Sequence, residues 1–176
     1  IELDPQASYY LQQGKWFFDY QYFKDAKISF SKAREKDKRL QPKEILGSLA
    51  QIEMCFCNWQ EARKLYQELL PFSANKIYIY LQLGKIAYEL KEDEEFLEYF
   101  KRVIEASCAP EYKREALYYR GELACRQGDL TLAIKFWSKS LSYGSSPKIH
   151  KKLGNAYVKQ KQFGKALVQL KKAKEK

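Results

Sequence analysis

One pattern of small and large residues occurs five times along the chain, and it constrains the fold more than any other feature. In the stretch Gly121–Ser140, Gly121 is followed twelve positions later by Ala133 and four positions after that by Trp137. Spacings of three and four continue on both sides of a Gln-Gly-Asp break. Such spacing predicts two short helices packed as a hairpin, with Gly128 in the left-handed conformation that ends the first helix.

The other copies follow at steps of 36, 34, 37 and 33 residues. Their first positions are Gly14, Ala50, Gly84, Gly121 and Gly154; their second positions are Ala26, Ala62, Phe96, Ala133 and Ala166; their large residues are Phe30, Tyr66, Phe100, Trp137 and Leu170. A single helix hairpin cannot bury its apolar face alone, so a repeat of this kind predicts a stack of hairpins.

These positions resemble the tetratricopeptide repeat (TPR) family, whose unit is a helix–turn–helix of about 34 residues with small and bulky residues at fixed positions. The resemblance covers nearly the whole chain and implies an all-α fold, a right-handed α-solenoid of stacked antiparallel helix hairpins. It departs from the family pattern at Phe96, where a small residue is expected, and at Glu53, where a large apolar one is expected.

The resemblance also implies the domain organisation. We expect a single array over residues 1–176, with units at about 7–40, 43–76, 77–110, 114–147 and 147–176. Residues 1–5 end in Pro5, which does not continue a helix, and they resemble the last turn of an upstream unit. We therefore expect these units to come from a longer array.

No constellation of catalytic or metal-binding residues stands out in the sequence. The one histidine, His150, falls at a packing position, and the Cys55-Phe-Cys57 spacing does not fit a zinc site. Glycine-rich phosphate loops and nucleophile elbows are absent from the sequence. We expect a protein that is not an enzyme and that carries no cofactor and no metal.

Binding then depends on the surface, and the family resemblance implies which surface. In TPR proteins, positions 2, 5, 9, 12 and 13 of each unit's first helix line a concave groove that holds ligand segments. The residues at such positions that we expect to contact a partner are Leu11, Phe18, Met54, Tyr78, Leu81, Lys85, Tyr88, Tyr118, Glu122, Lys148, Lys151 and Asn155. The alternative for each ring is that it completes the packing between units.

Charge is distributed unevenly along the chain. Residues 1–90 carry 13 Lys and Arg against 11 Asp and Glu, whereas residues 147–176 carry 10 against 1. The C-terminal unit therefore holds nearly all of the net charge of +10. This asymmetry favours an acidic partner surface or a polyanion at that end.

The favoured hypothesis is a non-catalytic, cytoplasmic scaffold whose groove binds a peptide or helix of another protein through apolar and acidic residues. Two alternatives stay open: nucleic-acid or polyanion binding by the C-terminal unit, and a structural spacer that self-associates through uncapped ends. No apolar run approaches the roughly 20 residues needed to span a bilayer.

Overall fold

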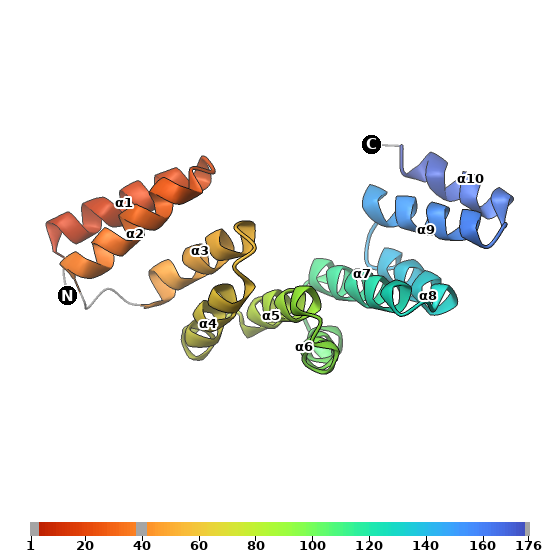
Figure 1. Ribbon diagram of the computed structural model, residues 1–176, viewed down its shortest axis with the longest axis horizontal. Coiled ribbons are helices and arrows are strands. Elements are labelled where there is room, and N and C mark those ends of the chain that lie inside the picture. The colour runs from red at the N-terminus through yellow and green to blue at the C-terminus, as the bar shows by residue number, and fades with distance from the viewer. Residues whose placement is uncertain (1–3, 38–41, 175–176) are drawn as a thin grey trace. The chain divides into compact units, whose positions relative to one another are not determined.

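The protein is a series of helix hairpins (Figure 1). The computed structural model describes residues 4–37 and 42–174, and all regular structure in these two ranges is helical. The α-helices are α1 (Pro5–Asp19), α2 (Phe23–Lys36), α3 (Pro42–Cys55), α4 (Trp59–Leu69), α5 (Lys76–Leu90), α6 (Asp93–Glu105), α7 (Pro110–Arg126), α8 (Leu130–Leu141), α9 (Pro147–Lys159) and α10 (Phe163–Lys172), with a short 3-10 helix at Leu70–Phe72.

The chain divides into two compact units, Ile1–Ile79 and Tyr80–Lys176. In the first unit, α1 packs with α2, α3 packs with α4, and α2 contacts α3. In the second unit, α7 packs with α8 and α9 packs with α10, while α6 contacts α7 and α8 contacts α9. The expected all-α fold of stacked helix hairpins is confirmed.

The recurring small–large pair is a contact between the two helices of a hairpin. A Cβ atom added at Gly14 would lie 2.6 Å from the Phe30 ring, and one added at Gly121 would overlap the Trp137 indole. Gly84 has the same relation to Phe100, at 2.7 Å, and Gly154 to Leu170, at 2.6 Å. The large side chain of the second helix therefore occupies the space that is free because the first helix has a glycine, with no Cβ, at the contact.

Each hairpin turn has one residue with a positive φ, followed by a residue whose N–H reaches back five positions. The five residues are Gln21, Cys57, Lys91, Gly128 and Lys161, with φ between 59° and 86°. In the fourth turn, for example, Asp129 N donates to Ala124 O at 2.9 Å, and Gly128 N donates to Cys125 O at 3.1 Å. This pair of hydrogen bonds defines a Schellman C-cap. The left-handed conformation expected for Gly128 is confirmed, and the other four turns form without glycine.

The two residues that depart from the family pattern are both buried. Phe96 is 0% exposed and packs edge-on against Phe100, with 4.6 Å between the ring centroids. Glu53 is 2% exposed; its carboxylate pairs with Lys27 at 2.6 Å and accepts a hydrogen bond from the Asn58 amide at 2.7 Å. Burial alone would raise the pKa of Glu53, but the bonds from Lys27 and Asn58 and the charge of Lys27 lower it overall.

Three helices begin at or near residues where the sequence predicted a helix start. Pro147 and Trp59 are the first residues of α9 and α4. Pro5 is the first residue of α1, where a missing N–H costs little, so α1 begins two residues ahead of the unit expected from Ala7. Residues 1–3 of the expected upstream tail, and the expected end of the first unit at residues 38–40, lie outside the described residues.

We predict that Gly121→Ala lowers the free energy of unfolding, because overpacking a filled contact costs about 1–3 kcal/mol and outweighs the gain in helix propensity. Gly164→Ala is the matched control, since a Cβ there meets no atom within 4 Å. It should be neutral or stabilise by up to about 1 kcal/mol. Thermal unfolding measures both, and equal effects would contradict the close-contact account.

We predict that Lys91→Gly stabilises the protein by a few tenths to about 1 kcal/mol, because a non-glycine residue at positive φ is strained. The same change at Lys135, an exposed residue inside α8, should cost about 1 kcal/mol. Urea denaturation compares the two variants. A loss of stability for Lys91→Gly as large as that for Lys135→Gly would show that the turn is not strained.

Candidate partner-binding surface

Four of the expected groove residues lie in the first compact unit. Leu11, in α1, is only 6% exposed and belongs to the apolar core. Phe18 and Met54 are half-buried, at the C-terminal ends of α1 and α3. Tyr78 is half-buried as well, and its hydroxyl accepts a hydrogen bond from the Gln51 amide. Phe18, Met54 and Tyr78 thus keep some surface that a partner can contact, whereas Leu11 keeps very little.

In the second unit, two neighbouring groove positions of α5 have different surroundings. Leu81 is 1% exposed, so its side chain serves packing. Lys85 is half-buried and its ammonium lies 2.6 Å from the Glu115 carboxylate of α7. The Lys85–Glu115 pair therefore connects the first helices of two successive hairpins.

Three tyrosines and one glutamate from α5 and α7 form a compact group, which we call the tyrosine cluster: Tyr88, Tyr118, Tyr119 and Glu122. The ring centroids of Tyr88 and Tyr119 are 5.5 Å apart, and those of Tyr118 and Tyr119 are 5.3 Å apart, both edge-on. Edge-on pairs of this kind are favourable because the positive rim of one ring meets the negative face of the other.

Titration behaviour also links these residues. Burial is the main reason why the pKa values of Tyr88 and Tyr118 are raised, and the negative charge of Glu122 raises both further. Burial and the nearby charges of Glu115 and Glu89 raise the pKa of Tyr119 to about 12. The cluster therefore brings together Tyr88, Tyr118 and Glu122, three residues that the sequence analysis selected separately.

Cations cover the exposed sides of this cluster. The Lys148 ammonium lies 4.3 Å from the centroid of the Tyr118 ring, and the Arg126 guanidinium lies 4.5 Å from that of Tyr88. Arg126 also pairs with Asp93, and Lys152 pairs with Glu122 at 2.7 Å. Tyr118 is only 7% exposed, so its ring is largely enclosed by its own hairpin stack and by Lys148.

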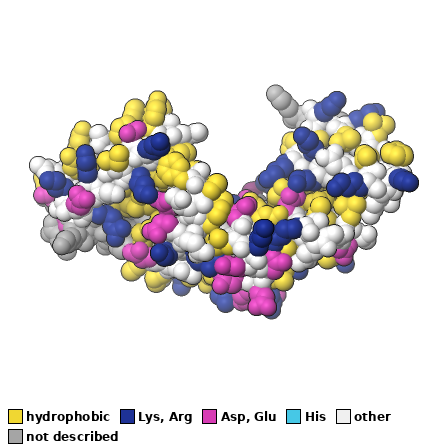
Figure 2. Space-filling view, in the orientation of Figure 1, with side chains coloured by type: hydrophobic (Ala, Val, Ile, Leu, Met, Phe, Trp, Pro, Cys, Tyr) yellow, Lys and Arg dark blue, Asp and Glu magenta, His cyan; other side chains and the backbone are white. Residues whose placement is uncertain are grey.

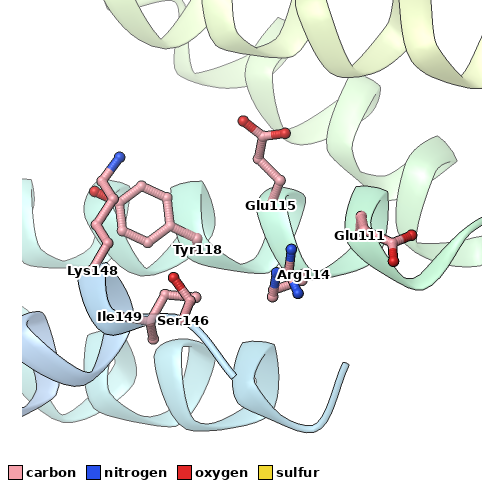
Figure 3. A pocket seen from close by; sticks show the side chains of 7 residues that line it. All are labelled: Glu111, Arg114, Glu115, Tyr118, Ser146, Lys148 and Ile149. Carbon is pink, nitrogen blue, oxygen red and sulfur yellow. The ribbon is translucent and has the colours of Figure 1, made fainter. Parts of the chain in front are cut away.

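A pocket of about 290 Å³ opens beside Tyr118, between the first helices of successive hairpins (Figure 3). Figure 3 shows Lys148 of α9 alongside the Tyr118 ring, with the acidic side chains on α7. The residues that line this α7–α9 pocket are Glu111, Arg114, Glu115, Tyr118, Ser146, Lys148 and Ile149. Both signs of charge therefore surround the pocket, together with the Tyr118 ring.

Sequence reasoning missed part of this lining, because the expected fourth unit began at Arg114. The structure begins α7 at Pro110, one turn earlier, which adds Glu111 to the same helix face. Proline at the first helical position was the available signal. Ser146 directly precedes α9, and its exposure to the pocket depends on the path of the preceding turn, which no sequence pattern specifies.

Lys151 and Asn155 complete the expected groove residues, and both are exposed on α9. Within the second unit, the α9–α10 hairpin carries blue lysine side chains beside yellow apolar ones on the face shown in Figure 2. Residues 147–174 contain nine lysines and neither Asp nor Glu. All of these lysines except the half-buried Lys152 are exposed, so the surface of this hairpin is basic.

Histidine and cysteine are among the residue types that most often serve in catalysis or metal binding, and the chain has one histidine and four cysteines. His150 is 7% exposed; its Nδ1 lies 2.7 Å from Gln169 Oε1 and its Nε2 lies 3.2 Å from Ser145 Oγ. An amide oxygen only accepts, so Nδ1 donates to Gln169, and in the neutral imidazole Nε2 accepts from the Ser145 hydroxyl. The four cysteines are free thiols, with Cys55 and Cys57 exposed. In residues 4–37 and 42–174, no three His, Cys, Asp or Glu side chains are grouped as metal ligands.

Several solved structures share this architecture at low sequence identity. PilF of Pseudomonas aeruginosa superposes with a TM-score of 0.76 at 18% identity, covering 96% of this chain and 75% of that one. MamA of Desulfovibrio magneticus RS-1 gives 0.74 at 16%, covering 99% and 96%. YrrB, described as a TPR protein with an unusual peptide-binding site, gives 0.61 at 19%, covering 93% and 82%.

No protein-family model and no curated protein matches the chain. Within the part that the structure describes, none of the helices has the length and apolar character to cross a membrane. The structural similarity bears on architecture: the chain has a TPR-like fold.

We predict that Glu122→Gln lowers the pKa values of Tyr88 and Tyr118, because it removes a negative charge that disfavours each tyrosinate. NMR titration of isotope-labelled tyrosine measures both values. Glu111→Gln is the control, since Glu111 is not among the charges that shift either pKa. Unchanged tyrosine titration in Glu122→Gln would contradict the cluster geometry.

Proposed function

We propose that the protein is a non-catalytic interaction scaffold that binds a peptide or helix of another protein at the first helices of the hairpins in its second unit. The α7–α9 pocket carries this proposal. It contains Tyr118 and Lys148, which the repeat resemblance had selected as groove residues, and it opens where successive first helices meet. Aromatic and charged side chains around a concave site are typical of surfaces that recognise peptides.

The charges around the pocket indicate what kind of segment would fit. Glu115 and Glu122 are each paired with a lysine, and Lys148 lies over a ring, so no single charge dominates the site. A bound segment would displace Lys148 from the Tyr118 ring and would gain its affinity mainly from apolar contact with the part of that ring so uncovered and with half-buried Tyr88. Charge would then contribute chiefly to the choice and the orientation of the partner.

The peptide-binding site reported for YrrB supports this proposal by analogy, since that protein shares the fold. Analogy of fold alone does not assign a function, because unrelated functions occur on one fold. The test therefore substitutes two side chains of the proposed site, Tyr88 and Lys148.

The test is affinity capture from lysate of the source cells, with and without nuclease treatment, using wild-type protein and Tyr88→Ala/Lys148→Glu. We expect a protein retained by the wild type to be depleted about tenfold or more on the variant, because loss of a buried ring contact and reversal of a charge each weaken binding. Bound proteins are quantified by mass spectrometry.

The matched control is Leu132→Ala/Lys135→Glu, which makes one apolar truncation and one charge reversal at exposed positions of α8. It should retain the partner, and circular dichroism should show all three proteins folded. Equal loss on both double variants, or loss caused by nuclease treatment alone, would overturn the groove proposal; the latter outcome would favour nucleic-acid binding by the basic hairpin.

A further inference from the structure

The C-terminal hairpin has a second hollow outside the α7–α9 pocket. Its volume is about 470 Å³, and we call it the C-terminal hollow. It is lined by Lys151 of α9, by Leu167, Leu170 and Lys171 of α10, and by Ala173 and Lys174, which follow α10. Leu167 is 57% exposed, so much of the apolar lining is open to solvent.

The preceding hairpin shows how the same surface is used when another hairpin stacks on it. A step of 33 residues relates Leu167 to Ile134 and Leu170 to Trp137. Trp137 is 2% exposed in a core that includes Ile149 and Leu153 of α9, and Ile134 packs against that core. In the α7–α8 hairpin, this surface of α8 is therefore apolar, and α9, the first helix of the next hairpin, covers it.

The same step relates the three lysines of the hollow to residues of a different kind. Lys151 corresponds to Tyr118, Lys171 to Ser138 and Lys174 to Leu141. Tyr118 is buried in the core of the second unit, and Leu141 packs against that core. The C-terminal hairpin thus keeps the apolar centre of a stacking surface and replaces a tyrosine, a serine and a leucine around it with positive charges.

Charge selects the occupant. With nine lysines and no Asp or Glu over residues 147–174, the hairpin repels another basic surface and attracts carboxylates. A purely apolar helix face would leave the lysine ammonium groups at its contact without partners, which is costly when they are desolvated. Lysine, unlike arginine, is a point charge without planar, two-pronged recognition of phosphate, and arginine is absent from residues 147–174.

We propose that the C-terminal hollow binds an acidic amphipathic segment of a partner protein. An apolar side chain of that segment packs on Leu167, Leu170 and Ala173, and flanking carboxylates pair with Lys151, Lys171 and Lys174. The hollow shares only Lys151 with the expected groove residues and none of its lining with the α7–α9 pocket, and this proposal does not depend on the groove proposal.

The test uses a fluorescently labelled synthetic peptide helix with leucines along one face and glutamates elsewhere, and measures its affinity for the full chain by fluorescence anisotropy. We expect Lys151→Glu/Lys171→Glu to weaken binding about tenfold or more through lost pairing and new repulsion. Leu167→Asn should weaken it as well, because it removes apolar lining.

Two controls isolate the hollow. Lys159→Glu/Lys161→Glu makes the same charge change at exposed positions of the same hairpin that do not line the hollow, and it should bind nearly as tightly as the wild type. Tyr88→Ala/Lys148→Glu should also retain the peptide, so failure of the groove proposal and failure of this one are distinguishable.

Four outcomes would overturn the proposal. Equal loss in both lysine pairs, or binding of polyglutamate as tight as that of the amphipathic peptide, would show diffuse charge attraction without an apolar anchor. Phosphatidylserine vesicles bound through these lysines while the peptide is not would identify a membrane surface instead. A dimer in sedimentation that Lys151→Glu/Lys171→Glu dissociates would identify a second copy of the chain as the occupant.

Discussion

The structure depends on one contact made inside each hairpin, between a small residue of the first helix and a large residue sixteen positions later on the second. Where the small residue is glycine, the large side chain occupies the space that a Cβ would take, as Trp137 does at Gly121. Because the two helices lie so close, the loop between them must be short, and in all five hairpins one left-handed residue ends the first helix. Stacking follows, because a hairpin closed this way still has an apolar face to bury.

This dependence explains how much of the fold could be predicted from the sequence. Gly121, Ala133 and Trp137 are chosen by contacts within some twenty residues of one another, so their spacing is visible in the chain. Glu53 shows the limit: its burial depends on Lys27, a residue of the preceding hairpin, and on Asn58 in the turn. Nothing in the spacing of apolar residues signals that a carboxylate with two such partners can replace a large apolar side chain.

The candidate site was predictable in its positions and less so in its chemistry. Repeat positions selected Tyr88, Tyr118 and Glu122, and these three do come together. The same positions selected Leu11 and Leu81, which are buried, and Tyr118 itself is only 7% exposed, because a helix position that faces a groove in one unit can face a neighbouring helix in another. The contact between Lys148 and the Tyr118 ring depends on side-chain direction across two hairpins, which a sequence pattern does not specify.

The two surfaces of the second unit differ in whether their charges are already paired. Around the tyrosine cluster, Lys85, Lys152 and Arg126 each have a carboxylate of the same chain, so an incoming acidic group competes with Glu115, Glu122 or Asp93. The α9–α10 hairpin supplies no carboxylate of its own over residues 147–174. Apart from Lys152, which pairs with Glu122 of α7, the lysines of this hairpin therefore have no carboxylate of their own hairpin that an acidic segment must displace, and the attraction acts at longer range. For the two proposed sites, the physical consequence would be a division of roles: the paired surface would discriminate by shape and ring contact, while the lysine-rich hairpin would favour fast encounter with any acidic partner and rely on its apolar centre to select among them.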